Sequence, residues 1–235
     1  MNAVLLAAGF GSRLMPITAT LPKCMVPIMG APLLEHWLKL CESLGIRNIV
    51  VNTHHLSNQV QNFIMSSRYK DYVDIQHEVQ LSGTAGTLRR NAHKFNDDAT
   101  LVVHADNWCI CDFPRFISAH QKNAREGYQM TMMTFRAQNP ELCGIVVTND
   151  HGTVTEFYEK KKNPPGNLAN AAIYILEPAV FKWMQNNPHI TDFSLDVIPC
   201  FMGKIKSWEN SGLLIDIGTL EALKRVQKNP LQEKS

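Results

Sequence analysis

Two kinds of hydrophobic spacing alternate along the first half of the chain. Short continuous apolar runs, typical of strands buried on both faces, occur at 3–7, 48–52 and 100–104, with a further strand predicted at 73–76. Between them the apolar positions recur every three or four residues, which predicts helices at 33–44, at 87–95 and from Ser57, taken as a cap.

This order of strand and helix predicts an α/β fold with a doubly wound, mostly parallel, Rossmann-like sheet. Ligands bind such sheets at the carboxyl ends of the strands. From Gln129 onward the pattern becomes strand-rich, with strands expected at 130–135, 144–148 and 154–158. We expect one domain over 1–228, with a first part at about 1–128, a strand-rich second part at 129–228 and a fraying tail at 229–235.

Composition and charge exclude several classes of function. The 235 residues carry a formal net charge of +2 with no basic run, which argues against nucleic acid as a partner. No apolar run approaches membrane-spanning length, and Met1 to Ala8 is expected to be a strand, not a signal peptide. The six cysteines are scattered, so we expect reduced thiols and a cytoplasmic protein; Cys109 and Cys111 are expected to pack rather than bind zinc.

The segment 5–13 carries the strongest chemical signal. A buried strand leads into a loop with Gly9 and Gly11, and the loop is followed by Arg13 and later Lys23. Glycines let backbone N–H groups approach phosphate oxygens, an arginine binds such oxygens in a fork, and a lysine acts as a point charge. We therefore predict a nucleotide-phosphate site formed by Ala7, Ala8, Gly9, Gly11, Ser12, Arg13 and Lys23.

Two better-known phosphate loops fit less well. A Walker loop needs Gly-Lys-Ser/Thr after its second glycine, where this chain has Ser12 and Arg13. A dinucleotide fingerprint needs a third glycine where Leu14 stands and then a helix, whereas Pro16 and Pro22 keep the segment open. An NAD-dependent oxidoreductase is disfavoured for the same reasons.

The segment 7–14 with Pro16, followed by 22–27 (Pro-Lys-Cys-Met-Val-Pro), resembles the signature of the sugar-nucleotide pyrophosphorylases. Later motifs follow in the family's order along almost the whole chain. The resemblance implies a nucleotidylyltransferase that joins a sugar 1-phosphate to a nucleoside triphosphate and releases pyrophosphate. It also implies that the part at about 1–128 is the nucleotide-binding part and that 129–228 is the sugar-binding part.

Two aspartates are candidate magnesium ligands. Asp106 follows the strand ending at His104, and Asp216 follows the apolar run 213–215, so both are expected at the ends of strands. Magnesium takes one or two carboxylates together with phosphate oxygens and water. Either aspartate could instead be a turn residue, and Asp216 could cap a helix at 220–226. The family resemblance favours the metal role for both.

The remaining site residues are implied by the resemblance. The loop 78–86 would recognise the base through Gln80, Gly83 and Thr84. Gly144, Glu159, Lys160 and Asn170 would bind the sugar phosphate. Two departures are visible: Lys161 stands where relatives carry proline, and Ala172 where they carry glycine, which adds a methyl group to the sugar pocket.

The mechanism expected is in-line transfer, with Arg13, Lys23 and Asp106 as the catalytic groups and Mg²⁺ as the cofactor. Similarity to the mannose-1-phosphate guanylyltransferase-like branch favours a GDP-sugar of the mannose or heptose type, for cell-envelope polysaccharide. A uridylyltransferase and a non-catalytic nucleotide-sugar-binding regulatory subunit remain alternatives. Self-association into a homo-oligomer stays open.

Overall fold

The computed structural model describes residues 1–95 and 97–231, and contacts between Cα atoms group them into two compact units. The first unit comprises Met1–Leu81, Val103–Ile110 and the chain from Gly212 onward. The second comprises Ser82–Val102 and Cys111–Ser211. Residue 128, where we expected the nucleotide-binding part to end, lies inside the second unit. Strand β6 (Thr100–His104) carries the chain from the second unit into the first.

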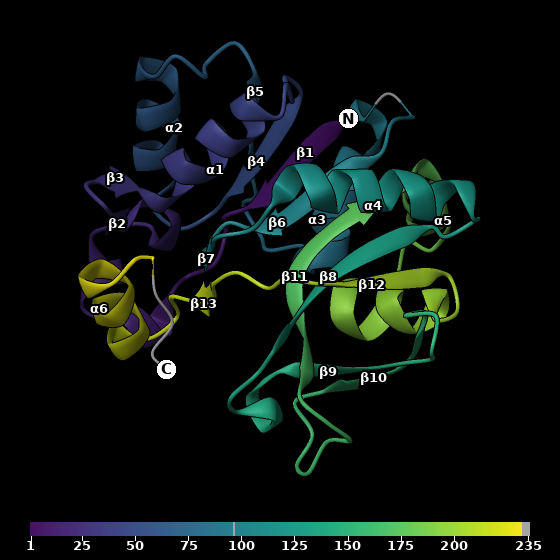
Figure 1. Cartoon of the computed structure of the whole chain (residues 1–235). Helices are drawn as coiled ribbons and strands as arrows, with labels where there is room; N and C mark the ends of the chain where they lie inside the picture. The colour runs from purple at the N-terminus through teal and green to yellow at the C-terminus, as the bar shows by residue number, and fades with distance from the viewer. Residues whose placement is uncertain (96, 232–235) are drawn as a thin grey trace. The chain divides into compact units, whose positions relative to one another are not determined.

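The first unit is built on parallel strands with helices packed beside them (Figure 1). Strand β4 (Ile49–Thr53) pairs in parallel with both β1 (Asn2–Leu6) and β5 (Val73–His77). Fully apolar stretches of β1 and β4 are buried, as the continuous hydrophobic runs predicted. The other elements are α1 (Leu33–Ser43), α2 (Ser57–Ser66), α6 (Leu220–Lys228), the strand pair β2 (Pro27–Ile28) and β3 (Ala31–Pro32), and the pair β7 (Asn107–Cys109) and β13 (Leu214–Asp216).

The second unit is strand-rich, as expected. Strand β8 (Met130–Arg136) pairs antiparallel with β11 (Leu168–Leu176) and parallel with β12 (Ile205–Glu209). Strand β9 (Gly144–Thr148) pairs antiparallel with β10 (Val154–Glu159), side by side in Figure 1, and also with β11. Its helices are α3 (Gly83–Asn91), α4 (Phe113–Arg125) and α5 (Pro178–Asn186), with short helical turns at Ala92–Lys94, Pro140–Leu142, Phe193–Val197 and Ile198–Phe201.

The starts of two helices differ from the predictions, and the alternative in which Asp216 caps a helix is wrong. Ser57 is the first residue of α2 and not its cap, which is Leu56 in a left-handed conformation without a side-chain hydrogen bond. The helix predicted at 87–95 begins earlier, at Gly83, so the proposed base loop ends in a helix. Asp216 is the last residue of β13 and does not cap α6, because the hydroxyl of Thr219 accepts the hydrogen bond from the N–H of Ala222 at 3.2 Å.

The predicted tail at 229–235 follows directly on helix α6 (Leu220–Lys228). Helix α6 continues to Lys228, and the carbonyl of Pro230 accepts a 2.7 Å hydrogen bond from the indole N–H of Trp108. Residues 232–235 of the predicted tail lie outside the described residues.

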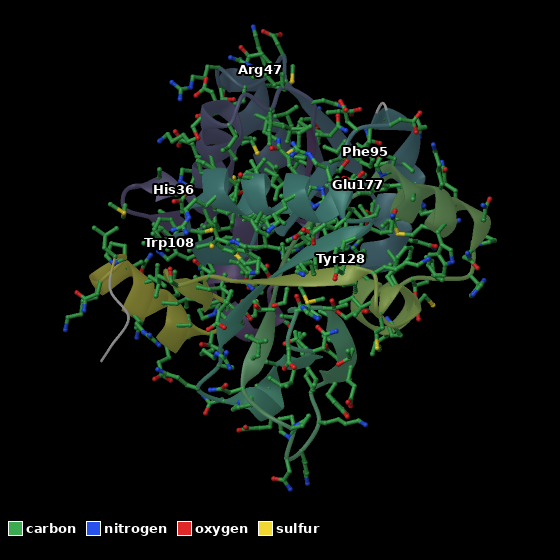
Figure 2. The ribbon with its side chains drawn as sticks, turned by 45° about the vertical axis from the view of Figure 1, so that its right-hand side comes forward. His36, Arg47, Phe95, Trp108, Tyr128 and Glu177 are labelled. Atoms are coloured by element: carbon green, nitrogen blue, oxygen red, sulfur yellow. The ribbon has the colours of Figure 1, made fainter. Side chains whose placement is uncertain are left out.

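A buried polar network in the second unit links α4 to β8 and to the start of α5. The ring of His120 contacts Thr131 Oγ1 at 2.9 Å and Glu177 Oε1 at 2.8 Å, and Asn123 donates to the same threonine oxygen. Glu177 is labelled in Figure 2. Burial lowers the pKa of His120, although Glu177 opposes the shift.

Candidate active site

The glycine loop begins at the carboxyl end of β1, and a side chain from β4 holds its first residue. The N–H of Ala7 donates to Asn52 Oδ1 at 2.7 Å. The amide of Asn52 in turn donates to Glu78 Oε1 at 2.9 Å, and both side chains belong to buried residues. Because the oxygen and the nitrogen of the Asn52 amide each have a hydrogen-bond partner, this relay fixes where the loop leaves the sheet.

Gly11 is required by the turn it makes. Its φ is +64°, and a Cβ placed there would lie 2.8 Å from Thr18 Cγ2. The hydroxyl of Thr18 donates to the carbonyl of Gly11 at 2.8 Å, which closes the loop. A Cβ on Gly9, by contrast, would meet nothing within 4 Å. Packing within the protein therefore explains why position 11 is a glycine. It does not explain Gly9, for which the predicted close approach of a ligand remains the reason.

Beyond this turn the loop runs through three short 3₁₀ turns, at Ser12–Leu14, Ile17–Ala19 and Lys23–Met25. No long helix follows the glycines, as the prolines predicted. Ala8 is buried, whereas Gly9, Ser12 and Arg13 are exposed.

Four charged side chains that the sequence singled out meet in the first unit. The ammonium of Lys23 lies 2.6 Å from Asp106 Oδ2 and 3.0 Å from Asp216 Oδ1. A guanidinium nitrogen of Arg13 lies 3.4 Å from Asp216 Oδ2. The Lys23 side chain is only 7% exposed, whereas that of Arg13 is 69% exposed. Lys23 therefore binds at the base of the cluster, and Arg13 lies at its solvent side.

Burial by itself would raise the pKa of Asp106, but the Lys23 ammonium, the nearby His104 and hydrogen bonds outweigh it. The net effect holds the pKa of this carboxyl below its ordinary value. Asp106 is thus a carboxylate at neutral pH, as a metal ligand must be.

A short antiparallel strand pair brings the two aspartates together. In the pairing of β7 with β13, Asn107 is opposite Asp216 and Trp108 is opposite Ile215. Asp106 comes directly before β7, and its carbonyl accepts from the N–H of Ile217 at 3.4 Å. The sequence prediction placed both residues at strand ends but missed β7, whose three residues Asn-Trp-Cys are too few to show a period.

Two side chains of helix α1 contact strand β7. The indole N–H of Trp37 donates to the carbonyl of Asn107 at 3.1 Å. The ring of His36 meets that of Trp108 edge-on with centroids 4.9 Å apart, and both residues are labelled in Figure 2. The backbone next to Asp106 is therefore held by packed aromatic side chains.

The donor set fits a magnesium ion that is completed by substrate. Among the residues that the structure describes, no group of three or more His, Cys, Asp or Glu side chains could hold a metal. Two carboxylates that share one cation supply hard oxygen ligands, and Mg²⁺ commonly takes its other ligands from phosphates and water.

The proposed base-recognition residues hold structural positions at the start of α3. Gly83 has φ +73°, and a Cβ there would lie 2.3 Å from the carbonyl oxygen of Thr191. The hydroxyl of Thr84 accepts from the N–H of Phe193 at 2.8 Å. Gln80 is exposed. Gly83 and Thr84 therefore anchor the segment at 191–193, whether or not they also contact a base.

The predicted sugar-phosphate residues gather around β9, β10 and β11 in the second unit. Glu159 is opposite Gly144 in the β9–β10 pairing, and a Cβ on Gly144 would lie 2.7 Å from Glu159 Oε2. Lys160 Nζ is 3.4 Å from Glu159 Oε1 and is well exposed. Asn170 donates to the hydroxyl of Tyr174 at 2.6 Å.

The two departures from the family pattern have visible consequences. The ammonium of Lys161 lies 5.0 Å from the centre of the Tyr158 ring, a cation–π contact. Ala172 has φ +54° where the register of β11 against β8 shifts, and its N–H donates to Asn170 Oδ1 at 3.0 Å. The alanine thus occupies a conformation that favours glycine.

One feature of the loop was missed. The exposed ring of Phe10 meets His54 edge-on at 4.9 Å, while His54 and His55 contact the carbonyls of Glu78 and Thr18. An aromatic residue between two glycines was the signal available in the sequence.

The fold and the charged cluster define a class of protein: the chain belongs to the nucleotidyl transferase family, whose model matches residues 2–233. Among its relatives, the chain is 30% identical over 227 residues to the mannose-1-phosphate guanylyltransferase catalytic subunit beta of Danio rerio. It is also 30% identical over 229 residues to a mannose-1-phosphate guanyltransferase of Aspergillus fumigatus. Each alignment covers 93% of this chain but only 61% of the relative.

Solved structures support the same fold. HddC from Yersinia pseudotuberculosis superposes with a TM-score of 0.79 at 22% identity, covering 97% of this chain and 98% of HddC. A UDP-glucose pyrophosphorylase complexed with UDP-glucose gives a TM-score of 0.82 at 18% identity, covering 97% of each chain. The predicted α/β class with a Rossmann-like, mostly parallel sheet is confirmed. No helix in the described part of the chain is long and apolar enough to cross a membrane.

Proposed function

We propose that this protein transfers a nucleotidyl group from a nucleoside triphosphate to a sugar 1-phosphate, releasing pyrophosphate. The observation that carries the proposal is the cluster of Lys23, Asp106, Asp216 and Arg13 beside the glycine loop. Two carboxylates and two cations in one place suit a reaction in which polyphosphate charge must be held and redistributed. Membership of the family supports the same reaction.

In this mechanism the chain's own residues position and neutralise charge. The loop from Ala7 to Ser12 would bind the triphosphate through backbone N–H groups, with Arg13 on the departing pyrophosphate and Lys23 on a phosphate near the reacting phosphorus. Asp106 and Asp216 would hold Mg²⁺, which supplies Lewis-acid stabilisation when bound. In the second unit, Glu159 would accept from sugar hydroxyls and Lys160 would bind the sugar's phosphate.

No covalent enzyme intermediate is needed. A sugar phosphate is already an anion near neutral pH, so it can attack the α-phosphorus without a strong general base. Cys24, next to Lys23, is the neighbouring thiol, and burial together with the charge of Asp106 raises its pKa to about 12. It stays protonated and is a poor nucleophile.

For the substrates we propose GTP and a mannose- or heptose-type sugar 1-phosphate, used for cell-envelope polysaccharide by a cytoplasmic enzyme. The support is the similarity to the named guanylyltransferases over 93% of this chain. The scattered spacing of the six cysteines, without paired C-x-x-C clusters, suits a reducing compartment.

A substrate panel tests the proposal. Each of four nucleoside triphosphates is paired with mannose, heptose, glucose and N-acetylmuramate 1-phosphates, and pyrophosphate release is measured with Mg²⁺. We expect turnover to be greatest with GTP. The Asp106→Asn variant is the negative control, and Asp112→Asn, at the cap of α4, is a matched control outside the cluster. Preference for UTP would replace the guanylyl assignment, and nucleotide-sugar binding without turnover of any pair would refute the enzyme.

A further inference from the structure

The position of the Lys23 ammonium has a meaning beyond phosphate binding. It lies 2.6 Å and 3.0 Å from one oxygen of each aspartate, so both carboxylates already share a single cation. Mg²⁺ binds oxygen at about 2.0–2.1 Å. A metal ion at the same point would need each oxygen to move by less than about 1 Å. The ammonium therefore stands where an ion bridging these two oxygens would bind.

We propose that Lys23 and a divalent metal ion compete for Asp106 and Asp216, so that the metal enters together with a triphosphate that takes over the ammonium. The inference rests on the proposed function for the identity of that polyanion. The competition itself concerns only the charged cluster of the first unit.

The balance of charge in the cluster supports entry of the metal together with a triphosphate. The cations of Lys23 and Arg13 match the charges of the two carboxylates, so these four side chains together carry no net charge. A divalent ion alone would add two positive charges beside a lysine side chain that is only 7% exposed. A buried ammonium is costly without an anion to pair with. A metal–triphosphate complex removes the difficulty, because its phosphates offer Lys23 a new partner.

The displacement requires only the side chain to move. Lys23 is the first residue of a 3₁₀ turn that follows Pro22, and the next residue in the turn, Cys24, is buried. Its backbone is therefore held, whereas the four-carbon stem of lysine can place the ammonium in several positions.

Binding of Mn²⁺ alone, without nucleotide, tests the competition. Wild type, Lys23→Met and the matched control Lys39→Met are titrated at pH 7.5 by electron paramagnetic resonance. Lys39 also pairs with a carboxylate, Glu35 at 2.8 Å on α1, so the same ammonium is removed outside the cluster. We expect Lys23→Met to bind Mn²⁺ at least about tenfold more tightly than wild type. At an effective dielectric constant of about 20, the repulsion between the ion and a lysine charge a few ångströms away corresponds to more than a tenfold change in affinity, and the variant lacks this repulsion. Lys39→Met should match wild type. Equal or weaker binding by a folded Lys23→Met would overturn the proposal.

A measurement on the wild type covers the case in which Lys23→Met does not fold. Acetylation of Lys23 by acetic anhydride is followed by mass spectrometry. The paired ammonium should be protected, and Mn²⁺ alone should increase its labelling in step with metal binding. Saturation with Mn²⁺ that leaves Lys23 protected would show that both cations fit at once, against the proposal.

These results separate the inference from the function. If the wild type transfers nucleotides but both metal tests fail, only the competition is wrong. If no substrate pair reacts while the metal tests succeed, the proposed reaction is wrong and the competition stands.

Discussion

Replacing Ala172 with glycine should stabilise the protein, the reverse of the usual effect of glycine in a strand. Ala172 has φ +54° within β11. A left-handed conformation costs an L-residue about 1–2 kcal/mol, whereas glycine adds about 0.5–1 kcal/mol of unfolded-state entropy. The midpoints of these two ranges predict a net gain of about 0.75 kcal/mol. In a chain of this size that raises the melting temperature by roughly 1–4 °C.

Thermal unfolding followed by circular dichroism measures the shift. Ala171→Gly is the matched control, because Ala171 is buried and is not among the positive-φ residues of the described chain. It should lose about 1 kcal/mol or more through the methyl group and the added entropy. Opposite signs for the two neighbours would support the conformational argument. A fall of similar size in both variants would refute it.

Three further predictions concern the cluster, the two cations and the buried histidine. Asp106→Ala should lower turnover roughly a hundred- to thousandfold, and Asp216→Ala should behave similarly with partial rescue at high Mg²⁺; near-normal pyrophosphate release by a folded Asp106→Ala would contradict the metal role. Arg13→Ala should mainly impair triphosphate use, whereas Lys160→Ala should raise KM for the sugar 1-phosphate; steady-state kinetics with each substrate varied would show otherwise if Lys160→Ala weakened only the triphosphate. Because the pKa of His120 is lowered in the fold, its unfolded state binds more protons below pH about 6.5, so stability should fall as the pH drops through that range. The free energy of unfolding, measured with urea at pH 7 and at pH 5, should fall by less between these pH values in His120→Asn than in wild type. An equal fall in the two proteins would count against the argument.

Elements with strong hydrophobic patterns were predictable from the sequence. The buried runs at β1, β4 and β6 and the amphipathic α1 appear within one or two residues of their predicted limits. The three runs are short and rich in β-branched or other apolar residues, which indicates buried strands, and the spacing of three or four residues in α1 indicates a helix. The start of α3 was missed because Gly83 and Thr84 have low helix propensity, and tertiary contacts with 191–193 hold the first turn instead.

The charged residues of the site were identified individually, but their arrangement was not. Nothing in the sequence shows that Lys23 lies between two carboxylates, because the distances depend on β7 and β13, three residues each. The relay from Ala7 through Asn52 to Glu78 was also invisible, since it joins residues from three separate segments. Side-chain contacts of this kind follow from tertiary packing and leave no periodic signal.

The pairing of β7 with β13 also affects how the site folds. The chain leaves the first unit at Ile110 and returns at Gly212, and the N–H of Ile110 donates to the carbonyl of Leu213 at 2.8 Å. Cys111–Ser211, which packs with Ser82–Val102 in the second unit, is therefore a long connection whose two flanking segments are one hydrogen bond apart. It also means that the aspartate pair forms only after a very long loop closes, so the carboxylates should come together late in folding.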